Sequence, residues 1–409
     1  MTHFTEKILA VFFTVIIILS ALSVSAGAFD AAERADCFTS DNAEIVCIAH
    51  RGDWHSYPEN SAEAVRTAAE FGVVSVDVKI TSDGNTVLMA DETTDRMCVD
   101  ASGKTVMGNV GDFTLEELKN MYLRSANGTS KNEKTDFHPA SLEDAAEAAG
   151  NNAALMLNIK CADFQKVLAK VKELGILDKV IFRFSDKNKV ILETVGNTEG
   201  VNYCGNYQGN IIFLATGAVK SCTENNVKTV ELGSKNGHGV LYDNFLMKRF
   251  DGKNKAMVSM VGGRCGKRTD NETGWDDLIA RGYSIIETDY PQDLSEYIQK
   301  IDTAKAELDR YVKLYKDTDT ASYTTDTEKA FSLSLNEAES LLEKSASLSQ
   351  LDSARYSLQS SFDGLTVGAK KAVTLSFDFT AGRAIAVILC GGAILASQIF
   401  LYRRREKKN

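Results

Sequence analysis

Residues 45–50 read Ile-Val-Cys-Ile-Ala-His, and Arg51 and Gly52 follow directly. A short apolar run that ends in ionisable side chains is typical of a buried parallel strand with functional groups at its carboxyl end. It is the first of nine strand-like runs, at 45–50, 74–80, 86–90, 155–160, 179–184, 201–205, 228–232, 257–261 and 283–288. Helix-like stretches lie between them, at 60–71, 114–123, 141–149, 163–174 and 274–281.

This alternation predicts a parallel sheet with helical crossovers. About 255 residues and about eight strand–helix units favour a closed (β/α)8 TIM barrel over an open, doubly wound sheet. No Gly-x-Gly-x-x-Gly motif follows the first run, which weakens the dinucleotide-binding alternative. The sequence therefore predicts an α/β barrel over residues 44–300, preceded by a polar leader at 29–43.

A different pattern begins after the barrel. Apolar residues recur every three or four positions in three stripes, which predict three amphipathic helices and a small bundle over 303–365. The stripes are Ile301, Ala304, Leu308 and Val312; Phe331, Leu335, Ala338 and Leu342; Leu351, Ala354, Leu358 and Phe362. A linker is expected at 366–382.

Both ends of the chain carry apolar runs. Residues 1–28 have the pattern of a secretory signal peptide cleaved after Ala26 or Ala28, with an uncleaved anchor as the alternative. Residues 383–402 are long enough for one transmembrane helix, and the basic tail at 403–409 is expected to stay in the cytoplasm. The sequence thus predicts a single-pass protein of the cell membrane, with its ectodomain outside a bacterial cell.

Composition excludes several classes. The chain has 409 residues, 44% hydrophobic and 25% charged, so it is globular rather than disordered. A net charge of −10 argues against nucleic-acid partners. Of its 8 cysteines, all but Cys390 precede the C-terminal apolar run, which leaves an odd number outside the membrane. No Cys-x-x-Cys motif is present, which excludes a zinc ribbon, while reduced thiols and a disulfide framework both stay open.

Seven short motifs follow one another in the order typical of one enzyme family. They are Ala49-His50-Arg51-Gly52, Pro58-Glu59-Asn60-Ser61, Asp77 with Thr81-x-Asp83-Gly84, Asp91-Glu92 with Arg96, Pro139-x-Ser141-Leu142-Glu143-Asp144, Lys160, and Thr288-Asp289-Tyr290-Pro291. The region of about 44–300 resembles the glycerophosphodiester phosphodiesterase family. The resemblance implies a (β/α)8 barrel that hydrolyses glycerol phosphodiesters with a divalent cation, Ca²⁺ or Mg²⁺, and an insertion at about 97–138 beside the site.

The resemblance also assigns roles to single residues. His50 is implied as a catalytic acid or base, Arg51 and Lys160 as ligands of the substrate phosphate, and Asp77 as a metal ligand. Three positions depart from the family pattern, because Ser75 and Asn158 stand where it has Glu metal ligands, and Ala90 stands where it has the second catalytic His. Fewer anionic ligands weaken a site for a hard cation, so metal binding is expected to be impaired.

The surviving residues are expected to meet at one place. His50, Asp77, Asn158 and Lys160 each lie at or near the carboxyl end of a strand, and so belong at the barrel mouth with Ser75 and Ala90. Arg51 and Lys160 should then leave a net positive pocket that holds an anionic phosphodiester without metal.

Other residues near the motifs are weaker candidates. A few other histidines and acids are candidates to take the place of the missing glutamates and histidine: His55, His138, His238, Asp53 and Asp91. Glu59 is expected to cap a helix, and Asp289 to be structural.

The helical region carries a second resemblance. Residues 303–365 resemble the FIVAR module, which is found in various architectures, through Tyr323-Thr324, Thr327, Ala338, Leu342, Leu351-Asp352, Ala354 and Leu358. Such a module implies a spacer or an interaction surface.

Three functions remain open at this point. The first is a degenerate family member that binds phosphodiesters or glycerol-phosphate wall polymers with little or no turnover. The second is an active phosphodiesterase of lipid or wall-polymer metabolism. The third is a structural surface protein. A barrel that served only as a scaffold would have no need for His50, Arg51, Asp77 and Lys160 together. Their presence therefore favours the first function.

Overall fold

The computed structural model describes most of the chain between residues 30 and 368. The described ranges are 30–41, 44–129, 131–159, 164–185, 198–208, 212–233, 247–248, 250, 254–261 and 269–368. The predicted signal peptide, the transmembrane segment at 383–402 and the basic tail lie outside them. In the ranges above, no helix is both long enough and apolar enough to cross a membrane.

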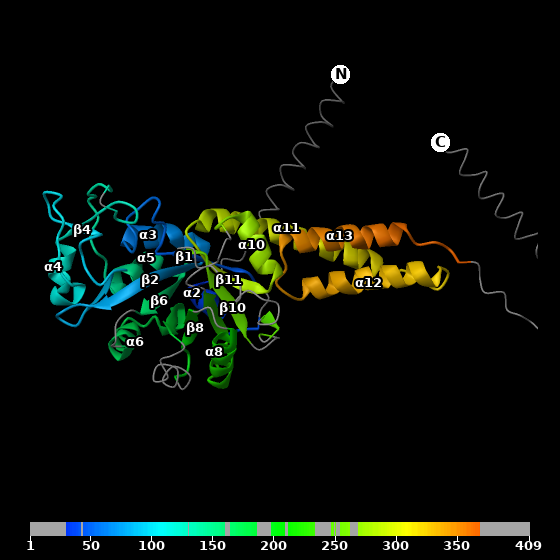
Figure 1. Ribbon diagram of the computed structural model, residues 1–409, viewed down its shortest axis with the longest axis horizontal. Coiled ribbons are helices and arrows are strands. Elements are labelled where there is room, and N and C mark those ends of the chain that lie inside the picture. Colours follow the sequence, from blue (N-terminus) through cyan, green and yellow to red (C-terminus); the bar gives the residue numbers. More distant parts are fainter. Residues whose placement is uncertain are drawn as a thin grey trace, which may run out of the picture. The chain divides into compact units, whose positions relative to one another are not determined.

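Eight parallel strands form a closed barrel (Figure 1). In chain order they are β1 (Val46–His50), β2 (Val73–Ile80), β6 (Ala154–Ile159), β7 (Val180–Ser185), β8 (Asn202–Gln208), β9 (Thr229–Gly233), β10 (Lys255–Ser259) and β11 (Tyr283–Thr288). They pair in the order β1-β11-β10-β9-β8-β7-β6-β2, and pairing of β1 with β2 closes the sheet. The short β3 (Thr86–Leu88) pairs antiparallel with β2. The predicted (β/α)8 barrel is confirmed.

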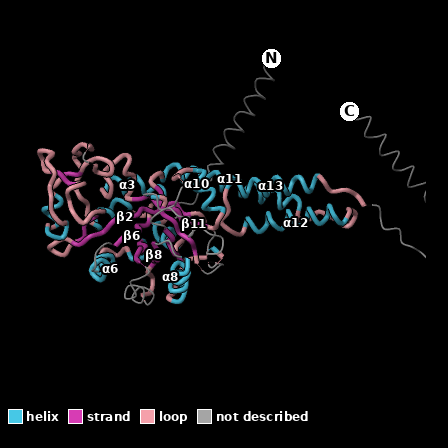
Figure 2. Tube along the Cα trace, in the orientation of Figure 1, coloured by secondary structure: helices cyan, strands magenta, loops and turns pink. Residues whose placement is uncertain are grey.

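Helices lie outside the strands (Figure 2). They are α3 (Ala62–Ala68) with the 3-10 turn η1 (Ala69–Phe71), α5 (Leu142–Ala149), α6 (Phe164–Glu173) with η3 (Leu177–Lys179), α8 (Ile212–Glu224), α10 (Glu272–Ala280) and α11 (Pro291–Tyr315). In α6, Phe164, Val167, Leu168 and Val171 are buried, and this spacing gives the helix one apolar face toward the barrel.

The stretch expected to be a polar leader belongs to the fold. Helix α2 (Ala31–Asp36) and Phe38 pack into one core cluster with Ile48, Met156 and Ile285. The Phe38 carbonyl accepts a hydrogen bond from Thr229 Oγ1 at 2.6 Å, and the Cys37 carbonyl accepts one from Lys255 Nζ at 2.7 Å. The leader prediction was wrong, because this short segment closes the end of the barrel opposite the strands' carboxyl ends.

The segment between β3 and α5 has a small core of its own. It contains β4 (Cys98–Val99), η2 (Val110–Asp112), α4 (Leu115–Lys119) and β5 (Tyr122–Leu123), with β4 and β5 paired antiparallel. Its core contains Val87 of β3 together with Met89, Met97, Cys98, Val110, Leu118, Met121 and Leu123. This insertion follows β3 and reaches the barrel mouth, defined here as the carboxyl ends of the barrel strands.

Three long helices carry the three predicted stripes. Helix α11 runs without a break through residue 303, so the last barrel helix and the first helix of the C-terminal region are one element. Helices α12 (Thr325–Leu342) and α13 (Leu348–Asp363) follow, and Ser349 at the start of α13 donates from Oγ to Asp276 of α10 at 2.5 Å. The division into a separate 303–365 module stays a prediction.

Of the described residues, 319–329 and 365–368 belong to a second compact unit. Within it, Tyr323 and Val367 form an antiparallel bridge, and the amide of Thr324 donates to the Thr366 carbonyl at 2.8 Å.

The cysteines that the structure describes are thiols. Five of them are buried without forming a disulfide: Cys37, Cys47, Cys98, Cys204 and Cys222. Burial raises the pKa of Cys98 to about 12, so this thiol stays protonated and unreactive at neutral pH.

Candidate active site at the barrel mouth

The His50-Arg51-Gly52 motif forms a tight turn after β1. Arg51 adopts a left-handed backbone conformation with φ 59°, and Gly52 follows with φ 81°. A Cβ atom at Gly52 would lie 2.5 Å from the carbonyl carbon of Ala64, so only glycine lets the turn approach α3 this closely. Asn60, also at φ 59°, donates its amide to the Arg51 carbonyl at 3.0 Å. The two motifs thus fix each other's backbone at the barrel mouth.

His50 is oriented by a carboxylate that directly follows the last barrel strand. Its Nδ1 lies 2.8 Å from Asp289 Oδ1, and Trp54 donates from Nε1 to the same oxygen at 2.9 Å. Burial raises the pKa of Asp289, but the bonds and charge of His50 outweigh burial and leave this pKa lowered. An ionised Asp289 fixes the ring through Nδ1 and leaves Nε2 for proton exchange.

Asp289 was expected to be structural, and the structure also brings its carboxylate to His50. The position of Asp289 could have indicated this contact. Asp289 directly follows β11, and β11 pairs with β1 to close the barrel, which brings the ends of the two strands together. Its backbone amide donates to Asp270 Oδ2 at 2.9 Å, which holds the loop in place.

Asp77, within β2, is surrounded by donors. Its Oδ2 accepts from Arg51 Nε at 2.8 Å and Asn60 Nδ2 at 3.3 Å, and its Oδ1 accepts from Asn158 Nδ2 at 2.6 Å. A carboxylate only accepts hydrogen bonds, so both asparagines turn their amide nitrogens toward it. Both oxygens of Asp77 are therefore engaged by neighbouring side chains.

Charges alternate from Asp77 outward into the insertion. Arg51 also donates from Nη1 to Glu59 at 2.9 Å, Glu59 pairs in addition with Arg96, and Arg96 pairs with Asp91. Glu59 is 3% exposed and does not cap α3, whose N-cap is Ser61; its role as a capping residue was predicted wrongly.

The charges of the described part of the mouth are balanced, and the expected net positive pocket stays a prediction because Lys160 lies outside the described residues. The series of alternating charges contains three carboxylates and two guanidinium groups. Within it, Arg51 forms ion pairs with both Glu59 and Asp77. Burial lowers the pKa of Arg51, but Asp77 and Glu59 together outweigh it and raise this pKa. Arg51 therefore stays charged inside a balanced network.

A second network fills the barrel below the mouth. Arg183 of β7 donates from Nε to Glu231 of β9 at 2.6 Å and from Nη1 to both carboxylate oxygens of Glu287 of β11 at 3.1 Å. Ser75 of β2 donates from Oγ to Glu287 at 2.6 Å. We call these four residues the interior ion cluster; all are buried, and Glu231 is 0% exposed.

Opposing effects act on Glu287. Burial raises its pKa, but the charge of Arg183, the charge of His50 and hydrogen bonds from Ser259 and Ser75 lower it to about 2. The carboxylate is thus ionised at all physiological pH values. The sequence analysis did not identify this cluster, because its charged members lie singly on strands far apart in the chain.

The remaining predicted residues are dispersed. Ala90 is buried, one residue after Met89, whose amide donates to the Asp77 carbonyl at 2.9 Å. His55 stacks between Trp54 and Tyr290, with ring centroids 4.0 and 5.0 Å away. Lys160 and His238 lie outside the described residues.

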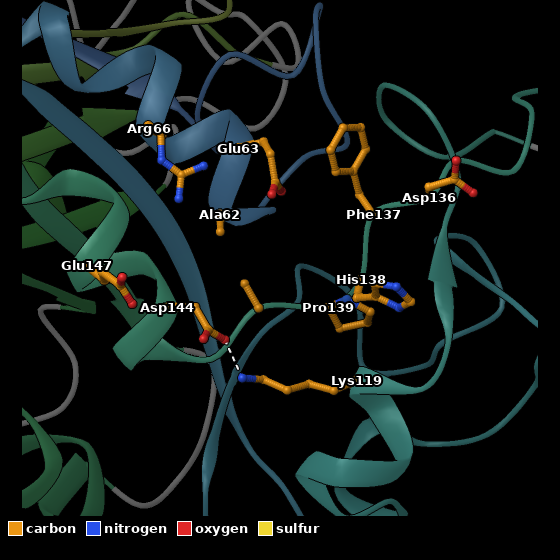
Figure 3. Close-up of a pocket in the computed structure, with 11 residues that line it drawn as sticks. Ala62, Glu63, Arg66, Lys119, Asp136, Phe137, His138, Pro139, Asp144 and Glu147 are labelled. Carbon is orange, nitrogen blue, oxygen red and sulfur yellow. Dashed lines mark ion pairs between the residues drawn. The ribbon is translucent and has the colours of Figure 1, made fainter.

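His138 lies in a different place, at a cavity of about 360 Å³ between α3, α5 and the insertion (Figure 3). Its Nδ1 is 2.6 Å from the Met121 carbonyl oxygen. Lys119 and Asp144 face each other across the cavity and pair at 2.6 Å. The lining residues include none of those at the His50–Asp289 pair, so His138 is not brought to the mouth.

Comparison with known proteins identifies the barrel. Residues 50–240 match the glycerophosphoryl diester phosphodiesterase family. The chain carries a domain of that family. The family domain resembles the glycerophosphodiester phosphodiesterase of Caldanaerobacter subterraneus, which is 45% identical over 80 residues, 19% of this chain and 30% of that protein. Human glycerophosphodiester phosphodiesterase 1 is 36% identical over 119 residues, 28% of this chain and 34% of its own length. The matches thus span about a third of these relatives.

A solved structure agrees on the fold. The crystal structure of a glycerophosphoryl diester phosphodiesterase from Parabacteroides distasonis superposes with a TM-score of 0.51 at 18% identity, over 66% of this chain and 92% of that one. At this identity the likeness establishes the barrel and says nothing about chemistry.

The divalent cation typical of the family does not fit the described residues. Of the three positions that carry metal carboxylates in the family pattern, only Asp77 is acidic here, and guanidinium and amide donors hold both of its oxygens. Ser75 directs its hydroxyl hydrogen at Glu287, and Asn158 directs its amide nitrogen at Asp77. A hard cation needs several oxygen ligands, and this set offers donors instead.

Proposed function

We propose that this family domain binds glycerophosphodiesters, or polymers built from glycerol phosphate, without a metal ion and with little or no hydrolysis. The observation that carries the proposal is the engagement of Asp77 by Arg51, Asn60 and Asn158. A metal would have to displace three donors from the only carboxylate left at the family's ligand positions.

The catalytic chemistry is reduced for a second reason. Phosphodiester cleavage needs one group to accept a proton and another to protonate the leaving alkoxide. His50 with Asp289 supplies one such group, whereas Ala90 has no ionisable atom at the position of the second histidine. Each missing contribution is worth about 10²–10⁴ in rate, so turnover is expected to be slow at best.

Binding survives these losses. The Nε2 atom of His50 remains for a hydrogen bond to a phosphate oxygen, and the family resemblance assigns a second phosphate contact to Lys160. Arg51 contributes through the remaining N–H groups of a guanidinium already fixed by Asp77 and Glu59.

One observation favours the second candidate function, an active phosphoric diester hydrolase. The His50–Asp289 contact of 2.8 Å is the arrangement that orients an imidazole for proton transfer. An enzyme of this kind would use His50 both as base and as acid.

The cellular setting is also a proposal. The apolar runs at 1–28 and 383–402 and the basic tail support an ectodomain anchored in the cell membrane by the C-terminal segment. The FIVAR-like residues support a spacer or interaction role for α12 and α13.

Calorimetry with the full-length chain tests the proposal. We expect glycerophosphocholine or a glycerol-phosphate polymer to bind in the presence of EDTA, and His50→Ala to weaken this binding at least tenfold. His138→Ala is the matched control, because His138 lines the separate cavity beside α3 and α5 and is not brought to the mouth. Equal binding by the parent and the His50 variant, or no binding by the parent, contradicts the proposal.

A further inference from the structure

The interior ion cluster has the composition of a cation site. Two buried carboxylates, Glu231 and Glu287, lie on either side of the same guanidinium group, and the Ser75 hydroxyl donates a hydrogen bond to Glu287. The space between the carboxylates is taken by the guanidinium of Arg183, which is 3% exposed. Burying two carboxylates without a cation would cost several kcal/mol for each ion, so some positive charge has to be present.

The cluster is joined to the positions that depart from the family pattern. Ser75 is one of them and donates to Glu287, while Asn158 is the strand neighbour of Arg183 and pairs with it in register. A glutamate at 75 would add a carboxylate beside Glu287, whereas the serine hydroxyl satisfies it. Neutral residues at 75 and 158 are therefore what we expect in a barrel whose interior positive charge is supplied by Arg183.

We propose that Arg183 is the resident cation of this barrel and occupies a latent divalent-cation site formed by Glu231 and Glu287. The guanidinium supplies the positive charge at this depth, and the barrel needs no metal ion to hold its carboxylates together. This inference does not depend on the proposed function, since it concerns cation binding and holds whether or not a phosphodiester binds at His50.

Thermal unfolding of the full-length chain tests the inference. The parent is expected to melt at the same temperature, within about 1 °C, in EDTA, Mg²⁺, Ca²⁺ or Mn²⁺. Arg183→Ala is expected to melt lower in EDTA, and then to gain about 5 °C or more with saturating Ca²⁺ or Mn²⁺, or with millimolar guanidinium chloride, because each cation refills the gap.

The matched control is Arg124→Ala. Arg124 is half-buried, and it donates to the Asn132 carbonyl and to Thr105 rather than to carboxylates. We expect this variant to show no response to any of these cations. If Arg183→Ala does not fold in EDTA, its refolding yield with and without Ca²⁺ is the readout, and cation-dependent refolding is expected.

Two results overturn the inference. The first is a saturable rise in the melting temperature of the parent with Mg²⁺ or Ca²⁺, which shows that the parent already has room for a metal. The second is an Arg183→Ala protein that gains neither stability nor refolding yield with any cation. Failure of phosphodiester binding leaves both measurements unaffected and contradicts only the proposed function.

Discussion

Replacing Glu59 by glutamine is expected to lower stability and to strengthen anion binding together. Glu59 is almost completely buried and bridges two guanidinium groups, Arg51 and Arg96. Removing one partner from a buried ion pair costs about 3–5 kcal/mol, because a charge is left uncompensated. Glutamine keeps one acceptor oxygen, so we expect the lower end, about 3 kcal/mol in the free energy of unfolding.

Urea denaturation measures this loss directly, and the melting temperature is expected to fall by about 6–12 °C. Glu63→Gln is the control, since Glu63 makes no ion pair within the described residues and its replacement should change stability by less than about 0.5 kcal/mol.

The same substitution releases positive charge at the mouth. The alternating series changes from three carboxylates and two guanidinium groups to an equal number of each. We therefore expect inorganic phosphate to bind about tenfold more tightly to Glu59→Gln than to the parent, a change of about 1.4 kcal/mol. Unchanged stability together with unchanged phosphate affinity refutes the idea that Glu59 balances these arginines.

Three further predictions concern other parts of the fold. Phe38→Ala should lower the free energy of unfolding by about 3–5 kcal/mol in urea, because Phe38 fills the closed end of the barrel; a loss below about 1 kcal/mol contradicts that packing role. Since the pKa of Glu287 is lowered to about 2 from an ordinary value near 4.5, its ionised form adds stability above pH 4.5 that is lost as the pH falls toward 2. The stability difference between the parent and Glu287→Gln should shrink over this pH range, and a constant difference speaks against it. Asp276→Ala should make the start of α13 more sensitive to proteolysis, because Asp276 accepts hydrogen bonds from both the amide and Oγ of Ser349; an unchanged digestion pattern counts against this contact.

The strands were predictable because their signal is local. Each barrel strand is a short apolar run bounded by polar residues, and all nine predicted runs correspond to strands of the structure. The short α2 was missed for the opposite reason, since Ala31 and Ala35 are its only buried residues and give no readable periodicity. The burial of α2 depends on Phe38 and on strands that come much later in the chain.

The site was predictable only as far as single motifs reach. His50, Arg51 and Asp77 were found because they belong to short motifs in or directly after strands, in a recognisable order. Their partners were not found, because pairing depends on barrel closure, which brings Asp289 to His50, and on inward-facing strand positions, which bring Arg183 between Glu231 and Glu287. A charged residue within an apolar strand, such as Arg183 in Val180–Ser185, is the one signal that pointed to an interior cluster.

Release of free alcohol from glycerophosphocholine by the full-length chain, measured in EDTA and then with Ca²⁺ or Mg²⁺, tests the central claim most directly. The account predicts a rate at or close to that of buffer in all three conditions, with binding of the ligand retained. Turnover in the ordinary range for enzymes, about 1–10³ s⁻¹, that appears with Ca²⁺ or Mg²⁺ and disappears with EDTA would contradict it.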